Sequence, residues 1–297
     1  LVLCALLVAS RDIIGGANWV QEKAWEPGCD LETAVEKGKS AFAGTELAGK
    51  TLGVVGLGAI GGLIANVAIH LGMKVIGCDP FLSVEGAWNL NHHVNRAATY
   101  DEIFAQADYI TLHVPSTKDT KNMICAESLA KMKDGVKLIN LSRADLVSAA
   151  DLAEALKAGK VSRYVTDFPT EEVLELPGTV AIPHLGASSA ESEDNCAIMA
   201  AKELIEYLEK GNIKNSVNFP NVEIDAEGER VAVIHHNVLS AVNDILGAFM
   251  KNGIETTGFA SKAKGDFAYT LVAADKIPDA VVNTLKANED IIKVRKI

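Results

Sequence analysis

The stretch TLGVVGLGAIGGLIAN, residues 51–66, joins an apolar run to three glycines at positions 56, 58 and 61. The apolar run has the length of a buried strand, and residues 59–72 have the length of a helix that ends at Gly72. A GxGxxG spacing at such a junction is typical of a turn that binds phosphate groups. The alternative is an ordinary strand–helix turn in a glycine-containing chain, and the surrounding residues decide between the two.

Each of the three glycines has a separate role in the phosphate-binding interpretation. Gly56 permits a tight turn, Gly58 lets the backbone approach a pyrophosphate, and Gly61 lets the helix pack closely on the strand. The first helical residues, Ala59 and Ile60, place unpaired N–H groups and the positive end of the helix dipole beside the phosphates. The stretch therefore predicts a dinucleotide-binding turn.

An acidic residue follows the turn at the distance that this interpretation requires. Asp79 ends the next apolar run, residues 74–79, roughly 20 residues after the glycines. Its carboxylate would accept hydrogen bonds from the adenosine ribose hydroxyls and would repel a 2′-phosphate. The cofactor that we expect is therefore NAD rather than NADP.

Apolar runs and helical segments continue to alternate along the first two thirds of the chain. We expect strands at 51–56, 74–79, 109–114, 136–142, 161–168 and 179–183, and helices at 59–72, 100–108, 127–135, 148–159 and 189–211. Nearly continuous apolar strands between helices indicate a parallel sheet that is covered on both faces. The fold class is therefore α/β, with a Rossmann-type doubly wound parallel sheet.

The pattern changes after a polar stretch that contains Pro220. Strand, helix, strand, strand, helix and strand are expected at 230–235, 238–253, 254–261, 266–274, 277–288 and 291–297. This βαββαβ order is that of a small ferredoxin-like module. We therefore expect an NAD-binding domain at 1–217, a linker at 218–228 and the small domain at 229–297.

Composition argues against several classes of function. The net charge of −11, without a basic stripe, argues against a nucleic-acid partner. The five cysteines are scattered and form no CxxC pair, which indicates a reducing, cytoplasmic compartment and no metal site. The opening LVLCALLVA has nine apolar residues, whereas a membrane span needs roughly 20, so we expect a buried helix and no membrane partner.

Three residues that can bind or move charge follow predicted strands on the carboxyl side of the sheet, where such folds place their chemistry. They are Arg143, Glu171 and His184. An arginine can bind a carboxylate through two parallel hydrogen bonds, and a histidine beside a carboxylate can exchange a proton near neutral pH. Each also has a structural alternative: a surface charge for the arginine, a solvated loop for the glutamate and a core position for the histidine.

Five motifs in a fixed order extend this picture beyond single residues. They are VVGLGAIGG, TLHVPSTKDTKNMI, LINLSRADLV, DFPTE and IPHLGASS. In this order they closely resemble the D-2-hydroxyacid dehydrogenases, over residues 1 to about 220. The DFPTE motif, the NFPNVEI segment and the C-terminal module most resemble the branch of this family that acts on 3-phosphoglycerate and carries a regulatory ACT domain.

The resemblance implies NAD-dependent oxidation of 3-phosphoglycerate to 3-phosphohydroxypyruvate, the first step of L-serine biosynthesis. It implies that Arg143 binds the substrate carboxylate, that His184 is the acid/base and that Glu171 pairs with it. The further cofactor contacts that it implies are His113, Val114, Pro115, Ser142, Asp167 and Gly186. The alternatives are another substrate, such as glycerate, hydroxypyruvate or D-lactate, and a non-catalytic protein that senses NADH.

Some positions depart from the family pattern. Ala144 stands where the family has glycine. The family's Asp-Val-Phe run reads Thr166-Asp167-Phe168 here, so either one residue is deleted and Asp167 keeps the role of the family's aspartate, or Thr166 has replaced it, and we prefer the deletion. Glu172 competes with its neighbour for the acidic role, and the FPTE motif favours the first of the two.

The family's first substrate-binding segment has no counterpart before the start of the chain. Either the chain belongs to a longer polypeptide, or it cannot close a cleft on substrate by itself. The opening residues resemble the family's dimerisation arm, where Trp19 and Trp25 would either pack across a dimer or fill their own core. We expect a homodimer or a homotetramer.

The tail contains a candidate effector loop. The segment VIHHNVLSAV resembles the ACT effector loop at His235 and Asn237, but it lacks the Pro-Gly turn of the family pattern. The module would therefore either bind L-serine or contact neighbouring subunits.

Overall fold

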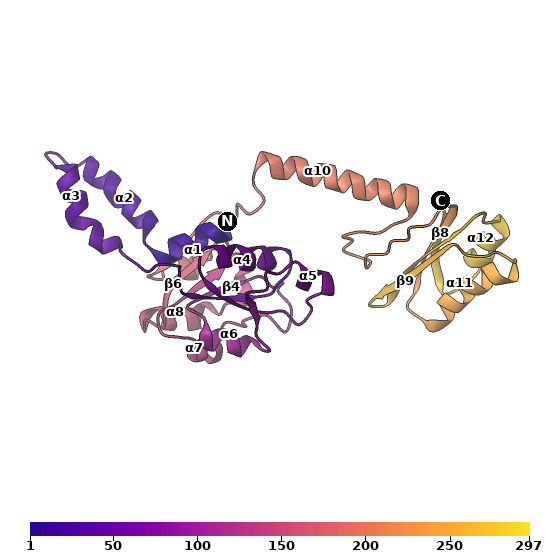
Figure 1. Cartoon of the computed structure of the whole chain (residues 1–297), viewed down its shortest axis with the longest axis horizontal. Coiled ribbons are helices and arrows are strands. Elements are labelled where there is room, and N and C mark those ends of the chain that lie inside the picture. Colours follow the sequence, from indigo (N-terminus) through magenta and orange to yellow (C-terminus); the bar gives the residue numbers. More distant parts are fainter. The chain divides into compact units, whose positions relative to one another are not determined.

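The computed structural model describes residues 1–297 and divides them into two compact units, Leu1–Ser188 and Ser189–Ile297, whose elements are labelled in Figure 1. The division falls before residue 217, where the sequence suggested a boundary, because helix α10 (Ala190–Ile205) and the π-helical turn η3 (Glu206–Lys210) belong with the second unit. The carbonyl of Tyr207 in η3 accepts a hydrogen bond from Arg295, whose guanidinium lies 4.2 Å from the tyrosine ring centre.

The first unit is built on one sheet of seven strands in the order β3-β2-β1-β4-β5-β6-β7, in which all neighbours pair in parallel. The strands are β1 (Thr51–Val55), β2 (Lys74–Cys78), β3 (Val94–Arg96), β4 (Tyr109–Leu112), β5 (Val136–Asn140), β6 (Val161–Thr166) and β7 (Thr179–Ala181). The order reverses at β1, because β2 and β3 lie on one side of it and β4 to β7 on the other. Such a reversal opens a crevice at the carboxyl ends of β1 and β4.

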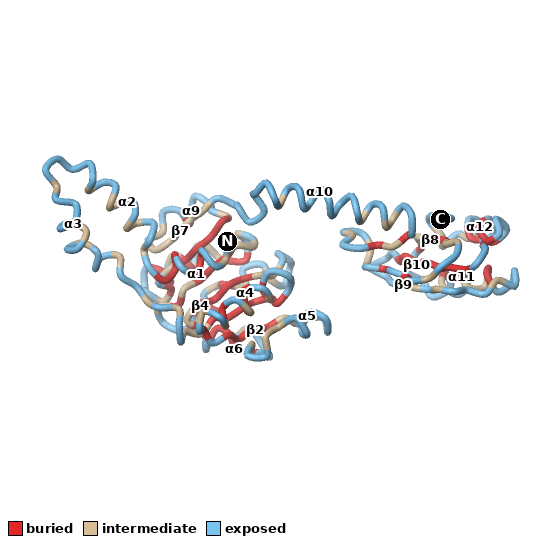
Figure 2. Tube along the Cα trace, turned by 45° about the horizontal axis from the view of Figure 1, so that its top comes forward, coloured by how far each residue is buried: buried red, intermediate tan, exposed pale blue.

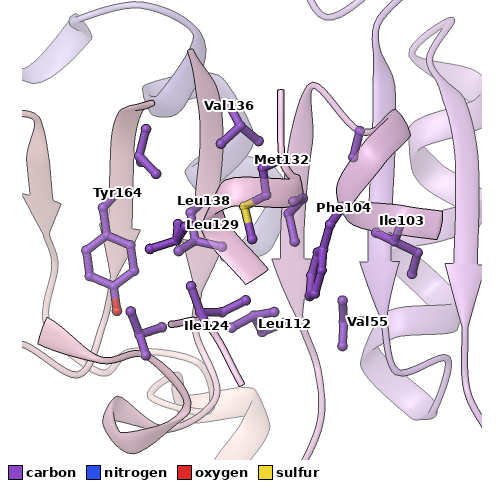
Figure 3. Close-up of a cluster of buried hydrophobic side chains, with 14 of the residues drawn as sticks. Val55, Ile103, Phe104, Leu112, Ile124, Leu129, Met132, Val136, Leu138 and Tyr164 are labelled. Carbon is purple, nitrogen blue, oxygen red and sulfur yellow. The ribbon is translucent and has the colours of Figure 1, made fainter. Parts of the chain in front are cut away.

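Helices cover both faces of this sheet. On one face, α6 (Tyr100–Gln106), α7 (Ala126–Lys131) and α8 (Ala149–Lys157) bury apolar side chains against the strands. Figure 3 shows part of this cluster, in which Phe104 of α6 lies close to Val55 of β1 and Leu112 of β4. On the other face, α1 (Val2–Ser10) and α4 (Ala59–His70) form a second cluster. The predicted doubly wound parallel sheet is confirmed.

The sequence of β1 reflects burial on both of its sides. Leu52 and Val54 belong to the cluster beneath α1 and α4, whereas Val55 belongs to the cluster beneath α6 and α7. None of the three side chains is exposed. Alternate residues of a strand point to opposite faces, so a strand that is covered on both sides is apolar at nearly every position.

The N-terminal segment divides into a buried helix and an exposed arm. α1 packs on β5 and β6 with Leu6 fully buried. The next two helices, α2 (Ile13–Ala24) and α3 (Leu31–Gly38), have no buried residue and form a hairpin that extends away from the sheet (Figures 1 and 2). In this arm Trp19 packs on Phe42, with 5.4 Å between ring centres, whereas Trp25 is 87% exposed.

No single helix is both long enough and apolar enough to cross a membrane, and α1 and α2 meet these criteria only when they are joined across a bend of 66°.

The second unit carries a four-stranded antiparallel sheet in the order β11-β8-β10-β9. After α10 and η3 its elements are β8 (Glu229–His236), α11 (Leu239–Lys251), β9 (Gly258–Lys264), β10 (Phe267–Ala274), α12 (Asp279–Lys286) and β11 (Ile291–Lys296). The predicted βαββαβ order is confirmed. Both helices cover the same sheet face, where Phe249 of α11 and Leu285 of α12 are buried.

Residues 218–228, expected to be a linker, contribute to the core of this second unit. Val222 is fully buried, and it packs with Ile213 and Ile224 against the sheet face opposite to α11 and α12. Two backbone hydrogen bonds join Ile213 to Val222. The segment is polar on average and contains Pro220, so its two buried side chains did not stand out in the sequence.

Several short elements were not expected from the sequence: α5 (Val84–Trp88), β3, α9 (Glu171–Leu174) and the 3-10 helices η1 (Lys39–Phe42) and η2 (Ala144–Leu146). β3 lies at the edge of the sheet and none of its residues is buried. α5 likewise has no buried residue. Without a buried face, neither element needs the apolar periodicity by which strands and helices are identified in a sequence.

Two neighbouring leucines test whether α1 belongs to the core of the first unit. We expect Leu6→Ala to lower the free energy of unfolding of this unit by about 2–5 kcal/mol, because it leaves a cavity. The control Leu7→Ala, at a residue that is 42% exposed, should cost less than about 1 kcal/mol. Urea unfolding followed by tryptophan fluorescence measures this, since all the tryptophans lie in the first unit: Trp19, Trp25 and Trp88. Equal losses in both variants would contradict the placement of α1.

Candidate active site

Close contacts hold the glycine turn between β1 and α4. Gly56 has a φ of +89°, and a Cβ there would lie 2.5 Å from the carbonyl oxygen of His113. A Cβ on Gly61 would lie 1.9 Å from the carbonyl oxygen of Gly56. At Gly58, by contrast, no heavy atom lies within 4 Å of the Cβ position. Gly56 and Gly61 therefore close the turn, while Gly58 leaves open space beside it.

α4 begins directly after this turn without a side-chain cap. Its N-cap residue is Gly58, and no side chain accepts a hydrogen bond at this helix end, whose first residues are Ala59, Ile60 and Gly61. Uncapped N–H groups and the positive end of the helix dipole attract anions such as phosphate. An open glycine and an uncapped helix end together fit the pyrophosphate of a dinucleotide.

Asp79 joins the end of β2 to the glycine turn. Its Oδ2 accepts a hydrogen bond from the Leu57 N–H at 2.9 Å, and its Oδ1 accepts one from the Phe81 N–H at 2.8 Å. Two cavities, of about 620 and 540 Å³, are both lined by Asp79, and the larger one also borders Gly58 and Ala59. Cavities of this size are typical of small-molecule sites. The carboxylate thus borders both cavities, and its contact with a ribose stays a prediction.

His113 closes the turn from the end of β4. Its Nε2 lies 2.9 Å from the Oγ1 of Thr111, whose side chain is fully buried. Burial lowers the pKa of His113 to about 4, so the imidazole is neutral at physiological pH. Val114 follows, with a side-chain carbon 3.0 Å from the Cβ position of Gly56, and Pro115 is exposed. This histidine therefore contributes packing and hydrogen bonding beside the turn rather than a positive charge.

The strands β5, β6 and β7 bring the expected catalytic residues to one edge of the sheet. Their last residues are neighbours in the parallel register, since Asn140 pairs with Thr166 and Thr166 pairs with Ala181. Arg143 follows β5 by three residues, and His184 follows β7 by three residues. Both side chains are exposed at this carboxyl edge.

Hydrogen bonds fix the loop that carries Arg143. Its Nη1 donates to the carbonyl of Ser142 at 2.6 Å, and the Ser142 Oγ donates to the carbonyl of Leu112 at 2.6 Å. The fully buried Asn140 donates from Nδ2 to the carbonyl of Arg143 at 2.8 Å. Asn140 was not among the residues predicted from the sequence, although an amide at the end of an otherwise apolar strand was a usable signal.

The Phe168 ring lies against both Arg143 and His184. Its ring centre lies 4.5 Å from that of His184, with 46° between the ring planes. The guanidinium carbon of Arg143 lies 5.6 Å from the same ring centre. In the sequence Phe168 is only one residue of the DFPTE motif, and a motif does not indicate which side chains meet in space.

Asp167 is the buried carboxylate of this edge. Its side chain is 3% exposed, and its Oδ1 has no hydrogen-bond partner. Burial raises the pKa of Asp167, although His184 and Arg143 both act in the opposite direction. The neighbouring Thr166 Oγ1 already accepts the N–H of Phe168 at 3.1 Å. Of the two residues that compete for the aspartate position, Asp167 is the one with a free acceptor.

Glu171 lies at the start of α9 and is exposed, as is Glu172. No ion pair joins either glutamate to His184 in this structure. The carboxyl group whose pKa His184 acts to lower is that of Asp167. Gly186 is exposed two residues after His184 and has open space around its Cβ position.

The two candidate effector residues of the second unit already have partners inside it. His235 is 1% exposed, with Nδ1 2.7 Å from the carbonyl oxygen of His236 and Nε2 2.8 Å from the Oγ1 of Thr270. The Asn237 Nδ2 donates to the carbonyl of Gly265 at 3.0 Å. A carbonyl oxygen only accepts, so Nδ1 carries a proton and donates it.

A comparison with protein families finds one match. Residues 3–186 match the family described as "D-isomer specific 2-hydroxyacid dehydrogenase, NAD binding domain". The matched residues contain the glycine turn, Asp79, Arg143 and His184.

Curated relatives match most of this chain, which spans about 40% of the length of the two described here. The D-3-phosphoglycerate dehydrogenase of Bacillus subtilis (strain 168) is 36% identical over 226 residues, which are 74% of this chain and 42% of that protein. The D-3-phosphoglycerate dehydrogenase of Archaeoglobus fulgidus is 34% identical over 228 residues, which are 74% of this chain and 40% of that protein.

Solved structures show the same architecture. A glyoxylate reductase from Paecilomyes thermophila has a TM-score of 0.60 and 26% identity, covering 72% of this chain and 62% of its own. A D-lactate dehydrogenase from Aquifex aeolicus, complexed with NAD and lactic acid, has a TM-score of 0.57 and 26% identity, covering 70% and 65%.

Adjacent glycines of α4 test the turn. We expect Gly61→Ala to weaken NAD binding by about tenfold or more, because its Cβ would displace the uncapped helix end from β1. Gly62→Ala is the control, since its Cβ would have no neighbour closer than 3.5 Å. Isothermal titration calorimetry with NAD measures both, and equal affinities would contradict the assigned phosphate site.

Proposed function

Because the chain belongs to the D-isomer specific 2-hydroxyacid dehydrogenase family, we propose that it takes part in the NAD-dependent oxidation of 3-phosphoglycerate to 3-phosphohydroxypyruvate, the first step of L-serine biosynthesis. The observation that carries the proposal is the meeting of Arg143 and His184 on one aromatic ring, on the same sheet edge as a turn that fits NAD. The choice of 3-phosphoglycerate rests on the names of the curated relatives.

The proposed roles follow from the chemistry of the two side chains. Bound NAD supplies the acceptor for the hydride that leaves C2 of the substrate. Arg143 binds the substrate carboxylate through two parallel hydrogen bonds and orients the adjacent C2 hydroxyl. His184 accepts the hydroxyl proton on a ring nitrogen as the carbonyl forms, and returns it in the reverse direction. The proton and the hydride together balance the oxidation of the alcohol.

Two carboxylates have different parts in this proposal. We assign the cofactor-facing role to Asp167, because its buried Oδ1 is a free acceptor beside the catalytic edge. The pairing of Glu171 with His184 stays a prediction, and it requires α9 to approach the histidine. A paired carboxylate would favour the protonated imidazole that forms during the oxidation.

The second unit is included in the proposal as an ACT-like regulatory module. Its βαββαβ order and its β11-β8-β10-β9 sheet support this assignment. L-serine as an effector would have to replace the present hydrogen bonds of His235 and Asn237. Contact with neighbouring subunits needs no such exchange and is the role that we propose for the module.

A substrate panel tests the proposed activity. With NAD, the full chain should form NADH from 3-phosphoglycerate and more slowly from D-glycerate or D-lactate. Arg143→Ala should reduce turnover by about 100-fold or more, because the carboxylate clamp is lost, and should leave the Kd for NAD within a few-fold. Arg11→Ala, an exposed arginine at the start of the arm, is the control.

The outcomes of this panel separate the alternatives. Faster turnover of D-glycerate or D-lactate than of 3-phosphoglycerate would show that the substrate is another 2-hydroxy acid. NAD binding without turnover of any of the three would contradict an enzymatic role for this chain and would favour an NADH-sensing protein.

We propose that the arm of α2 and α3 joins two copies of the chain in a homodimer, which a second contact can extend to a tetramer. Its unburied helices and the 87% exposed Trp25 support this, because such apolar surface is costly to leave in water. Trp25→Ser should shift the sedimentation coefficient towards that of a monomer. Trp88→Ser, at a tryptophan outside the arm that is 83% exposed, should not. A monomeric wild-type chain would contradict this assembly.

A further inference from the structure

Phe168 occupies the middle position of the proposed catalytic edge. It follows β6, which lies between β5 and β7 in the sheet. Arg143 follows the first of these neighbours and His184 follows the second. The parallel register therefore places an aromatic side chain between a residue that always carries a positive charge and one that gains a positive charge in the proposed reaction.

The ring contacts both of these groups. It lies 4.5 Å from the His184 ring, centre to centre, at a tilt of 46°. It lies 5.6 Å from the guanidinium carbon of Arg143. The first geometry is that of a favourable tilted aromatic pair, and the second is within the range of a cation–π interaction.

The position of the ring is fixed from its own backbone. The Phe168 N–H donates to the Oγ1 of Thr166 at 3.1 Å, and Thr166 is fully buried at the end of β6. Phe168 belongs to neither hydrophobic cluster of the first unit. Its contacts with Arg143 and His184 are therefore not a by-product of packing in the core.

An uncharged ring at this position avoids the competition with substrate that a carboxylate would cause. Two neighbouring cations repel each other, and a carboxylate between them would remove the repulsion by pairing with Arg143. That carboxylate would then compete with the substrate for the guanidinium. The negative face of an aromatic ring attracts cations while adding no net charge, so both groups remain available to substrate.

We infer that Phe168 is a positioning residue, whose ring holds the His184 imidazole and the Arg143 guanidinium in the geometry that the oxidation requires. This inference rests on the proposed function. Arg143 and His184 are both exposed, so without the ring their side chains would sample several rotamers.

Kinetics of three variants test the inference. We expect Phe168→Leu, which keeps an apolar side chain but removes the ring, to lower kcat for 3-phosphoglycerate about tenfold, with KM for NAD unchanged. Phe168→Tyr retains the ring and should recover kcat to within about twofold. Phe259→Leu, at a phenylalanine of the second unit that is 41% exposed, is the control and should behave as the wild-type chain.

Nuclear magnetic resonance of the histidine ring protons tests the contact without any turnover. In the wild-type chain the Phe168 ring current should shift the His184 ring protons, which His184→Gln identifies by their disappearance. The shift should be lost in Phe168→Leu and kept in Phe168→Tyr. If Phe168 had only a structural role, the ring-current shift of His184 and kcat would not be lost together in Phe168→Leu and restored together in Phe168→Tyr.

The outcomes distinguish this inference from the proposed function. Turnover by the wild-type chain with an unchanged kcat in Phe168→Leu, or identical His184 shifts in both chains, would overturn the positioning role alone. No turnover by the wild-type chain with any 2-hydroxy acid would overturn the proposed function, and the kinetic role of Phe168 with it. A tenfold loss that tyrosine restores, together with the lost shift, supports both.

Discussion

The first unit depends on the close approach of three backbone segments at the glycine turn. The carbonyl of Gly56 lies where a Cβ of Gly61 would be, and the carbonyl of His113 lies where a Cβ of Gly56 would be. One contact joins α4 to β1, and the other joins β1 to β4. Because the strand order reverses at β1, these contacts also form the floor of the crevice in which such folds bind their ligands.

The edge that carries Arg143, Phe168 and His184 depends on strand register rather than on contact along the chain. Asn140, Thr166 and Ala181 are neighbours at the ends of β5, β6 and β7, and this fixes the starting points of three loops. Buried polar groups then hold the loops in place, such as the Asn140 amide beneath Arg143. A buried amide that is fully hydrogen-bonded costs little, whereas one without its partner would be expensive, so the backbone of the Arg143 loop is held in place.

Buried and exposed acids are distributed unevenly around this edge. Asp167 is buried beside His184 and Arg143, while the acidic pair at the start of α9 is exposed to solvent. The family resemblance ranked these carboxylates by motif position alone. In the structure Asp167 has a buried oxygen atom without a hydrogen-bond partner, whereas water screens the charges of the two exposed glutamates.

The sequence by itself determined the fold class, the glycine turn, the βαββαβ tail and the strands that Arg143 and His184 follow. These features follow from local rules, because buried strands, helices and glycine turns each require a characteristic pattern of neighbouring residues. Only the tertiary structure decided that Phe168 lies between Arg143 and His184, that Val222 covers a sheet face, and that α10 belongs with the second unit. These are contacts between segments far apart in the chain, and no periodicity along the sequence encodes which distant side chains will meet.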